Sequence, residues 1–321
     1  MKKLLLAILA TTCISAQAAG IITHNLFADK SVTPTTTPKM QEIIQQYSDD
    51  FLVGSDYPDT GYAFGATYGE DTHWAPFMNA FLRHLDDKGG IENNPRLAAF
   101  LFGIHSHNAS DIIWHWGFIS YTADCSNRDW QKIHSLADTD LELAIASQNY
   151  KLFPSTPKWK VPVNDLVAIY QRMGKNYTAE EIIHSNRIYH LATIAEHIRI
   201  KSRLLRFAFI KHAKRVFPEC GYSQLPKWLE FTYKEVESDR ELLWNAALTG
   251  GNVVDYPKPY SLVDNGLAQR INEKLMLKVN EEMLNWITVE QSGDWYQFSF
   301  DEKYRNDLEK WVREVIEDWL N

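Results

Sequence analysis

The most informative feature of this 321-residue sequence is a stripe of three side chains, His107, Asp111 and His115, spaced four residues apart. On an α-helix, such positions lie along one face. The neighbouring residues, among them Phe100–Phe102 and Ile112–Ile113, are strongly apolar. Burying imidazole and carboxylate groups is costly unless they have partners. The stripe therefore indicates either a set of metal ligands or a hydrogen-bonded network in the core.

Four further stretches carry side chains of the same types. Each of them alone has an ordinary structural explanation, because a single histidine or an aspartate-rich turn is common in any fold. Together they add these candidates to the stripe: His134 with Asp138 at i, i+4 on one helical face, His73 between Thr72 and Trp74, Asp56 and Asp59 in a turn after Gly54, and His24 near the N-terminus.

The candidate ligands are imidazoles and carboxylates, since no cysteine is well placed among them. This donor set suits Zn²⁺ or Mn²⁺, and a site rich in histidine favours zinc. One tetrahedral zinc needs about four ligands, so the larger set predicts two or three ions. Clusters of this kind suit displacement at a phosphate ester, because the ions hold the phosphoryl oxygens and lower the pKa of a water.

The N-terminus has the pattern of a secretory signal peptide. Lys2 and Lys3 precede an apolar run, Leu4–Ile14, which is too short to span a bilayer as a stable helix. Ala16–Ala18 fits the small-x-small cleavage rule. We therefore expect residues 1–18 to be removed, the mature chain to begin at Ala19, and the protein to be exported to the periplasm or beyond the cell.

Composition and charge limit the classes of partner. Hydrophobic residues make up 45% of the chain and aromatic residues 13%, enough for a sizeable core. The net charge of −8 argues against a stable nucleic-acid partner. After residue 18 no apolar run is long enough for a transmembrane helix. Cys125 and Cys220 could form one disulfide or remain two separate thiols, and both alternatives stay open.

Helical patterns run through nearly the whole chain, so we expect an all-α fold. Asn94 before Pro95 predicts a helix start, and Thr178 with Glu181 predicts a capping box. A weak alternation predicts a short strand at residues 294–300. The expected helices cover residues 96–116, ended by Gly117, and residues 129–147, 178–216, 225–248, 262–286 and 301–320, with breaks at residues 154–162 and 218–226.

Taken together, these motifs resemble the zinc-dependent phospholipase C domain, which occurs in bacterial phospholipases C and in GPI-specific phospholipase D and shares its fold with zinc nucleases that prefer single strands. The resemblance covers residues 19–140 closely and fades afterwards. It departs from the family at Asp29, where a second histidine is common, and we expect no β-propeller repeats like those of GPI-specific phospholipase D. The residues that carry it are Thr23-His24, Gly54 with Pro58-Asp59, Thr72-His73-Trp74, Pro76-Phe77, Phe100–Ile104, Ser106-His107, Asp111, Trp114-His115, His134-Ser135 and Asp138.

The resemblance implies a multi-helix phospholipase C or zinc nuclease-like fold with a trinuclear zinc site. Residues 19–321 would form one domain, with the ligands in residues 19–140 and supporting helices in residues 160–321. One zinc would bind Asp59, His73 and His107, with Asp111 as a bridging carboxylate. A second would share Asp111 and bind His24 together with the free amine and carbonyl of Ala19. The third would bind His115, His134 and Asp138.

The resemblance also implies the chemistry. A hydroxide would attack phosphorus, with Asp59 orienting or deprotonating it or serving only as a ligand; Asp56 competes for this role. The expected activity is phospholipase C cleavage of a glycerophospholipid at a membrane or micelle surface. The alternatives are a single-strand nuclease or nucleotidase on the same cluster, and a non-catalytic zinc- or lipid-binding protein.

Several other residues have ordinary interpretations. We interpret His184, His190 and His197 as core or surface residues, and His105 as a packing residue on another face of the stripe's helix. Lys211, Lys214 and Arg215 suit the C-terminal end of a helix. Three tryptophans flank expected ligands and could line a lipid or choline site or simply pack around it: Trp74, Trp114 and Trp116.

Overall fold

The structure is a computed structural model that describes residues 20–63, 66–149, 151, 157–253 and 281–320. Within these residues the chain is mostly helical, with one small sheet, and the predicted fold class is confirmed at that level. The predicted signal peptide and Ala19 lie outside the described residues, as does most of the helix predicted at residues 262–286. Its end is present as the short helix α17 (Glu281–Leu284).

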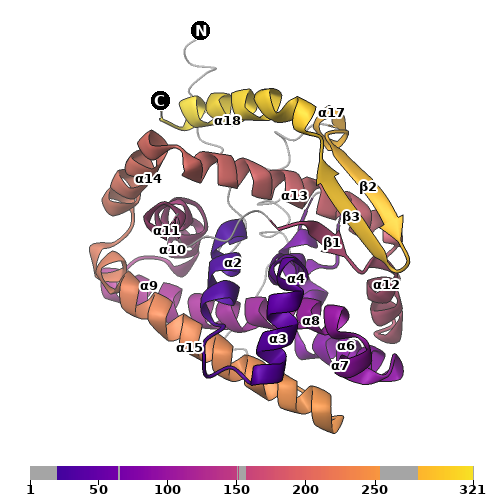
Figure 1. Cartoon of the computed structure of the whole chain (residues 1–321). Coiled ribbons are helices and arrows are strands. Elements are labelled where there is room, and N and C mark those ends of the chain that lie inside the picture. The colour runs from indigo at the N-terminus through magenta and orange to yellow at the C-terminus, as the bar shows by residue number, and fades with distance from the viewer. Residues whose placement is uncertain (1–19, 64–65, 150, 152–156, 254–280, 321) are drawn as a thin grey trace.

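The helices surround α2, which runs through the middle of the bundle and packs against α4, α8, α11, α13 and α15 (Figure 1). The bounds of the helices before residue 150 are α2 Gly20–Lys30, α3 Pro38–Gln46, α4 Ser48–Thr60, α5 Gly69–Thr72, α6 Ala75–Asp87, α7 Gly90–Asn93, α8 Pro95–Ile112, η1 Ile113–Ile119, α9 Ser120–Ser126, α10 Trp130–Leu136, η2 Ala137–Leu141 and α11 Glu142–Asn149. Those of the later helices are α12 Val163–Arg172, α13 Ala179–Lys201, α14 Arg203–Val216, α15 Glu219–Thr249, η3 Glu302–Tyr304 and α18 Arg305–Leu320.

The helix that carries the stripe begins at Pro95, as predicted, but Gly117 does not end it. The helical segment continues from α8 through η1, a π-helix, into α9. It ends at Asn127, which has the left-handed backbone conformation. Gly117 lies inside η1, where the ring of Trp228 packs directly against it. Glycine is therefore placed here by its contact with Trp228, although its local propensity alone would predict the end of a helix.

The predicted helix over residues 178–216 exists as two helices. Thr178 caps α13 as predicted, because its side chain accepts from the backbone N–H of Glu181. The chain then breaks at Ser202, whose hydroxyl caps α14 by accepting from the N–H of Leu205. Serine favours this position because its oxygen satisfies an N–H that the first turn leaves unpaired.

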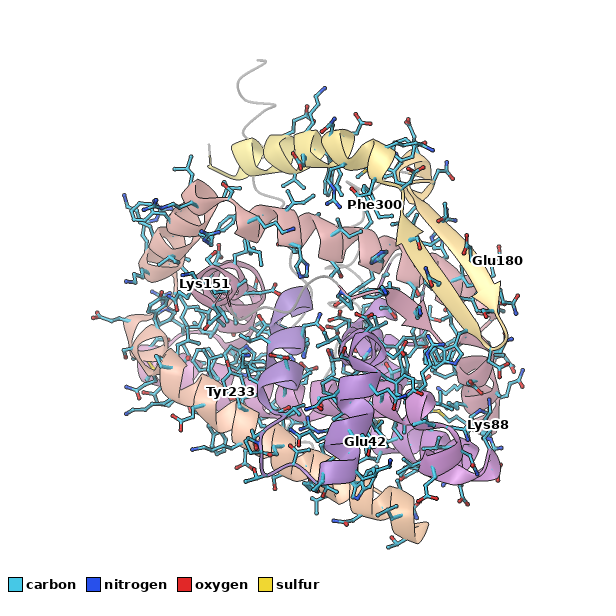
Figure 2. The ribbon with its side chains drawn as sticks, viewed as in Figure 1. Glu42, Lys88, Lys151, Glu180, Tyr233 and Phe300 are labelled. Atoms are coloured by element: carbon cyan, nitrogen blue, oxygen red, sulfur yellow. A yellow bond between two sulfur atoms is a disulfide. The ribbon has the colours of Figure 1, made fainter. Side chains whose placement is uncertain are left out.

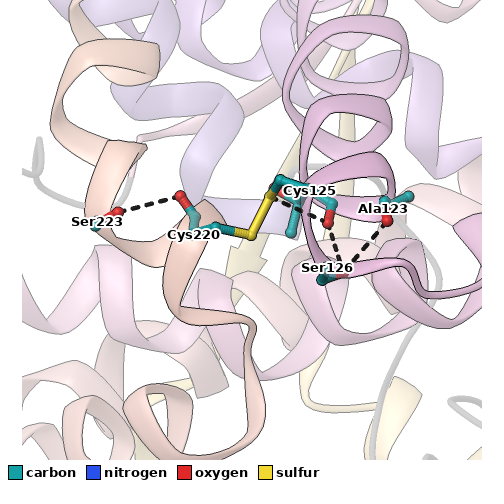
Figure 3. Close-up of a disulfide and its surroundings, with 6 residues drawn as sticks. Ala123, Cys125, Ser126, Cys220 and Ser223 are labelled. Carbon is teal, nitrogen blue, oxygen red and sulfur yellow. Dashed lines mark hydrogen bonds between the residues drawn. A yellow bond between two sulfur atoms is a disulfide. The ribbon is translucent and has the colours of Figure 1, made fainter.

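The predicted break at residues 218–226 is wrong. Pro218 is only the residue before α15, and Pro226 lies inside that helix. The first turns of α15 are held from outside, because Cys220 forms a disulfide with Cys125 of α9 (Figure 3). The two cysteines are 95 residues apart, and closing a loop of about 100 residues stabilises a fold by up to about 4.7 kcal/mol in the chain-entropy model.

A small antiparallel sheet lies beside α13 and α12. It has the order β1-β3-β2, formed by β1 (Trp159–Val161), β2 (Ile287–Ser292) and β3 (Trp295–Phe300). The predicted strand is β3, which pairs Phe298 with both Trp159 and Val289. β1 lies in the break predicted at residues 154–162, and β2 was not predicted.

Two helices that carry site residues, α4 and α8, cross in unusually close contact. A Cβ added to Gly103 would lie 2.0 Å from the carbonyl oxygen of Phe51, and one added to Gly54 would lie 2.2 Å from that of Phe100. Each contact is between glycine and backbone, which cannot be moved aside cheaply. The absence of both side chains therefore sets the distance between the two helices.

On the other side of α2, aromatic side chains join it to α15 and η1. Phe27 lies with its ring 5.3 Å from that of Trp114 and 6.0 Å from that of Tyr233. Tyr233 is labelled on α15 in Figure 2. In the described part of the chain, no helix combines the length and apolar character needed to cross a membrane.

We predict that Gly103→Ala destabilises the protein by about 3 kcal/mol, because the new methyl group overpacks against the backbone of α4. Urea unfolding measures this loss. Gly251→Ala is the matched control: its added Cβ meets its nearest neighbour at 3.3 Å, so the change should stay within about 1 kcal/mol. Equal stability of the two variants would contradict the close crossing.

Candidate metal centre

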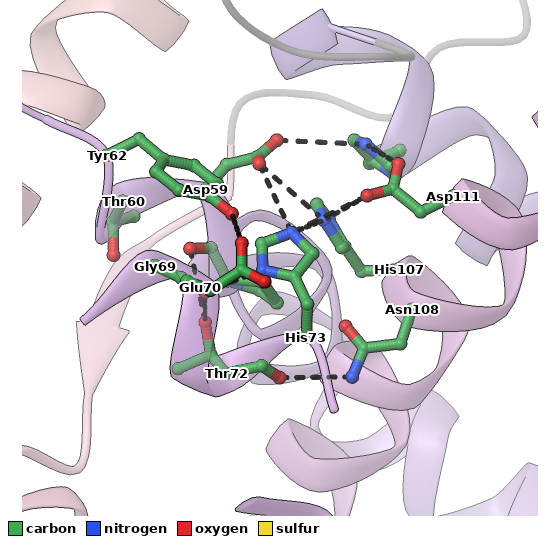
Figure 4. A network of polar contacts seen from close by, with 12 residues as sticks. Asp59, Thr60, Tyr62, Gly69, Glu70, Thr72, His73, His107, Asn108 and Asp111 are labelled. Atoms are coloured by element: carbon green, nitrogen blue, oxygen red, sulfur yellow. Dashed lines mark hydrogen bonds and ion pairs between the residues drawn. The ribbon is translucent and has the colours of Figure 1, made fainter. Parts of the chain in front are cut away.

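Five predicted ligands from four helical segments meet at one buried place. His24 comes from α2, Asp59 from α4 and His73 from the residue after α5, and α8 supplies His107 and Asp111 (Figure 4). Two overlapping groups of three have ligand atoms within 4.8 Å of one another: His24, Asp59 and His107, and His73, His107 and Asp111.

The two carboxylates face the imidazoles at distances longer than a hydrogen bond. Nε2 of His24 lies 3.4 Å from Oδ1 of Asp111 and 3.7 Å from Oδ2 of Asp59. Nε2 of His73 lies 3.5 Å from Asp111 and 3.6 Å from Asp59. For His107 the corresponding distances are 3.6 and 3.7 Å. Contacts of this length leave the facing atoms close together but incompletely paired.

The other ring nitrogen of each imidazole has a fixed partner. Nδ1 of His73 donates to the carbonyl of Gly69 at 2.7 Å, and Nδ1 of His107 donates to that of Ser55 at 2.8 Å. In the neutral form of both rings, Nε2 then carries a lone pair. These two Nε2 atoms are only 3.1 Å apart, so a positive charge must lie at or between them.

Nδ1 of His24 also has a fixed partner, but this partner is the side chain of Ser110 and not a backbone carbonyl. The hydroxyl of Ser110 donates to the carbonyl of His107 at 2.8 Å. Its proton is therefore committed, and Nδ1 of His24 donates to the hydroxyl oxygen at 3.1 Å. The lone pair of His24 Nε2 consequently points into the same cluster as the other two. Fixing the ring in this way is how proteins commonly orient metal-binding histidines.

Three atoms in the cluster are buried and have no hydrogen-bond partner within the described residues: Nε2 of His24, Oδ2 of Asp59 and Oδ1 of Asp111. Leaving such atoms unpaired costs about 1–3 kcal/mol each, more if they are charged. A divalent cation would satisfy all three. The donor set of neutral imidazole nitrogens and carboxylate oxygens fits zinc.

The electrostatics of the cluster favour an ionised Asp111 and added positive charge. Burial raises the pKa of Asp111, but the charges of His107 and His115 outweigh it and hold this pKa well below the usual range. Burial and His107 lower the pKa of His24 well below its usual value. For His73, burial is outweighed by Asp59 and Asp111, which raise its pKa to about 9. A metal ion would compete with this proton for Nε2 of His73.

His115 of η1 and His134 of α10 lie next to this cluster. Nε2 of His115 lies 3.7 Å from Oδ1 of Asp111, and its Nδ1 lies 3.1 Å from Nε2 of His134. Burial lowers the pKa of both histidines, which favours neutral rings able to bind a metal. His115 lies in η1, and η2 follows His134; π-helical turns of this kind are frequent at functional sites. Asp138 belongs to η2, but its side chain lies outside the described residues.

Within the described residues, Asp56 forms no ion pair with the imidazoles, whose carboxylate neighbours are Asp59 and Asp111. It accepts a hydrogen bond from Asn25 at 2.8 Å. Burial and the charge of Asp59 raise its pKa well above the usual value, although the hydrogen bond from Asn25 opposes them. Asp56 therefore joins α4 to α2 through Asn25. Of the two candidates, Asp59 is the one whose carboxylate faces the cluster.

Some residues around the cluster were not predicted. Glu70 accepts from the indole N–H of Trp74 at 2.9 Å and from the hydroxyl of Tyr62 at 3.3 Å, and the Tyr62 ring lies 5.4 Å from that of His73 (Figure 4). The amide of Asn108 donates to the carbonyl of Thr72 at 3.1 Å. The four-residue spacing of Glu70 and Trp74 was the only signal in the sequence, and it is common.

The three tryptophans near the cluster differ in their surroundings. Trp114 is 1% exposed and stacks on Phe118, so it is a core residue. Trp116 is half-buried and stacks on Trp130 at 5.7 Å, beside His115. Trp74 is also half-buried. Trp74 and Trp116 are thus the two partly exposed tryptophans among the three that flank expected ligands.

The remaining histidines lie away from the cluster. Nε2 of His105 donates to the carbonyl of Asp239 in α15 at 3.0 Å, as a packing residue would. His190 and His197 are buried on α13 and border a cavity of about 270 Å³ between α13 and the sheet. Burial and the neighbouring His197 lower the pKa of His190 to about 3. None of the residues in the metal cluster lines this cavity.

Comparison with known proteins places these features in a family. A family profile described as zinc dependent phospholipase C matches residues 14–203. A phosphatidylinositol-glycan-specific phospholipase D of Dictyostelium discoideum is 31% identical over 191 residues, covering 53% of this chain and 20% of that protein. The Homo sapiens protein of that name is 26% identical over 199 residues, covering 56% and 24%. No solved structure matches the chain.

The chain thus spans about a fifth to a quarter of the length of these curated relatives. All nine predicted ligands lie within the matched residues. Their assignment to particular metal ions stays a prediction.

We predict that His107→Ala removes zinc binding and hydrolytic activity together, because it deletes an inward Nε2 that belongs to both groups of three. Elemental analysis and the zinc-dependent rise in melting temperature measure the first effect. His105→Ala is the control, two residues away on another face of the same helix, and should keep its zinc. Wild-type zinc content in His107→Ala would refute the ligand assignment.

Proposed function

The chain belongs to the zinc-dependent phospholipase C family, and from this we propose that it is a phospholipase of the C type that hydrolyses glycerophospholipids such as phosphatidylcholine. The family and the relatives indicate a phospholipid-hydrolysing enzyme that depends on zinc. The observation that carries the proposal is the convergence of three inward-facing Nε2 atoms and two carboxylates in one buried cluster.

We propose three zinc positions. The first uses Asp59, His73 and His107, with Asp111 shared with the second, which also takes His24 and the amine and carbonyl of Ala19. The third uses His115, His134 and Asp138. The short distance from His115 to Asp111 supports a third position adjoining the first two. Zinc, when bound, lowers the pKa of a water and polarises phosphoryl oxygens.

The protein's own groups supply orientation and proton transfer. The carbonyls of Gly69 and Ser55 and the hydroxyl of Ser110 hold three rings in one tautomer, so no reorganisation is needed when substrate arrives. Asp59 has one oxygen without a hydrogen-bond partner among the described residues. That oxygen can orient an attacking water or accept its proton, which is the role we propose for Asp59.

The type of cleavage depends on which oxygen leaves phosphorus. Cleavage of the C type breaks the bond to the glycerol oxygen, and cleavage of the D type breaks the bond to the headgroup oxygen. The curated relatives are named for the D type, but they match this chain over only part of their length. Half-buried Trp74 and Trp116 beside the cluster suit a quaternary ammonium headgroup, which supports phosphatidylcholine as substrate.

We also propose that the protein is exported and works outside the cytoplasm. The Cys125–Cys220 disulfide supports this, because such bonds persist in oxidising compartments. The proposed role of the Ala19 amine has the same requirement, since that amine exists only after a signal peptide has been removed.

Analysis of the products tests the proposal directly. We predict that the mature protein converts phosphatidylcholine to diacylglycerol and phosphocholine, and that a chelator abolishes the reaction. Thin-layer chromatography of the lipid and an assay for free choline distinguish this outcome from phosphatidic acid and choline, which would show the D type. Chelator-sensitive cleavage of single-stranded DNA without lipid hydrolysis would reject a phospholipase. A zinc-replete protein inert on both substrates would indicate a binding protein.

We predict that Asp59→Asn lowers kcat by about 100-fold or more, the usual contribution of an acid–base group. Asp56→Asn should stay within about threefold of the parent, because Asp56 accepts from Asn25 outside the metal cluster and an amide oxygen can accept the same bond. Steady-state kinetics on a water-soluble phosphocholine diester give both values. The reverse order of effects would assign the role to Asp56.

A further inference from the structure

An exposed apolar and basic surface lies on α14. Leu204 and Phe207 are 76% and 67% exposed, which is unusual for large apolar side chains. They lie three residues apart, so they share one face of the helix. Lys211, Lys214 and Arg215 continue that face at the later turns, and all three are exposed. These five residues are here called the α14 surface.

The opposite face of α14 holds the helix on the body of the protein. Phe209 and Ala213 are buried, and Nε2 of His212 lies 2.9 Å from a carboxylate oxygen of Asp140 in η2. Arg206 donates to the carbonyls of Ile200 and Lys201 at the end of α13. The outward direction of Leu204 and Phe207 therefore follows from the packing of the helix.

The positive charge of this helix is not neutralised locally. α14 contains five basic residues and no acidic residue, in a chain whose net charge is −8. Four of the five, Arg203, Lys211, Lys214 and Arg215, form no ion pair with a carboxylate in the described part of the chain. A place near the end of the helix accounts for Lys211, Lys214 and Arg215, but it does not explain the exposed apolar residues beside them.

We propose that the α14 surface docks the enzyme onto an anionic lipid bilayer. Apolar side chains flanked by Lys and Arg on one helical face are the combination that enters the boundary between headgroups and acyl chains. The inference rests on the proposed function, since a phospholipase must reach its substrate in a bilayer. α14 packs on η2, which directly follows the helix carrying His134, so docking there would hold the metal cluster near the lipid.

The chain offers a matched control surface on α15. Phe231 and Leu242 are 46% and 63% exposed there, again one phenylalanine and one leucine. α15 contains six acidic and three basic residues, so its surroundings have the opposite charge. The surface of α15 should therefore not bind an anionic bilayer, although its exposed apolar side chains are of the same types.

The experiment compares two serine double variants of the mature protein with bound metal: Leu204→Ser with Phe207→Ser on α14, and Phe231→Ser with Leu242→Ser on α15. Flotation in the cold measures binding to vesicles of phosphatidylcholine, with and without phosphatidylglycerol. We expect the α14 variant to bind the anionic vesicles about tenfold or more weakly, from the loss of buried apolar area, and the α15 variant to bind like the parent.

A second variant of α14 tests the contribution of the basic residues to binding. Lys211→Gln, Lys214→Gln and Arg215→Gln together should weaken binding to anionic vesicles by about fivefold per charge removed, and salt should weaken the parent in the same way. Unchanged binding by either α14 variant, or parental binding that is indifferent to phosphatidylglycerol, would overturn the proposal.

Hydrolysis of a water-soluble phosphocholine diester separates this inference from the proposed function. The variants on α14 should keep the parental kcat/KM on that substrate while losing activity on vesicles. If the parent binds vesicles through α14 but hydrolyses no lipid, the docking surface is supported and the proposed phospholipase activity is rejected. If the parent is active on vesicles and both α14 variants bind and hydrolyse them equally well, the enzyme is supported and the docking surface is rejected.

Discussion

The structure depends on a buried group of lone pairs and carboxylates that cannot satisfy one another. Nε2 atoms of His24, His73 and His107 face Asp59 and Asp111, and each ring uses its other nitrogen elsewhere. Such a group would destabilise the folded chain unless positive charge joined it. The cluster therefore creates a binding site for a cation, and cation binding in turn stabilises the folded chain. The same coupling of metal binding and folding occurs in other proteins whose ligands come from several segments.

The packing that brings these atoms together has a simple basis. α4 and α8 contact each other through Gly54 and Gly103, so Asp59 reaches the same place as His107 and Asp111. α2 then lies against both helices and adds His24. Arg240 of α15 is fully buried and donates to Ser31 and Ser106, which fixes α15 against the end of α2 and the middle of α8. Rigid helices, rather than loops, therefore hold most of the ligands.

Part of this arrangement was visible in the sequence. The four-residue spacing of His107 and Asp111 directly predicted a shared helical face, whereas the convergence of His24, Asp59 and His73 came from the family resemblance, because no local pattern joins distant segments. The carbonyl partners of the imidazoles were not predictable, since backbone groups carry no sequence signal. Pro226 within α15 and the three-residue strand β1 were missed for a related reason: long-range contacts there override local propensity.

The π-helix η1 has a consequence for how this family can vary. A π turn holds one residue more than an α turn at nearly the same rise, and each residue of an α-helix turns the chain by about 100°. Deleting a single residue within Ile113–Ile119 would turn a wide turn into an ordinary α turn and leave α9, with Cys125, close to its place beside α15. A relative that lacks one residue here should therefore be able to keep the disulfide, whereas a one-residue deletion within α8 or α9, which have no extra residue in the turn, would rotate everything after it by about 100°.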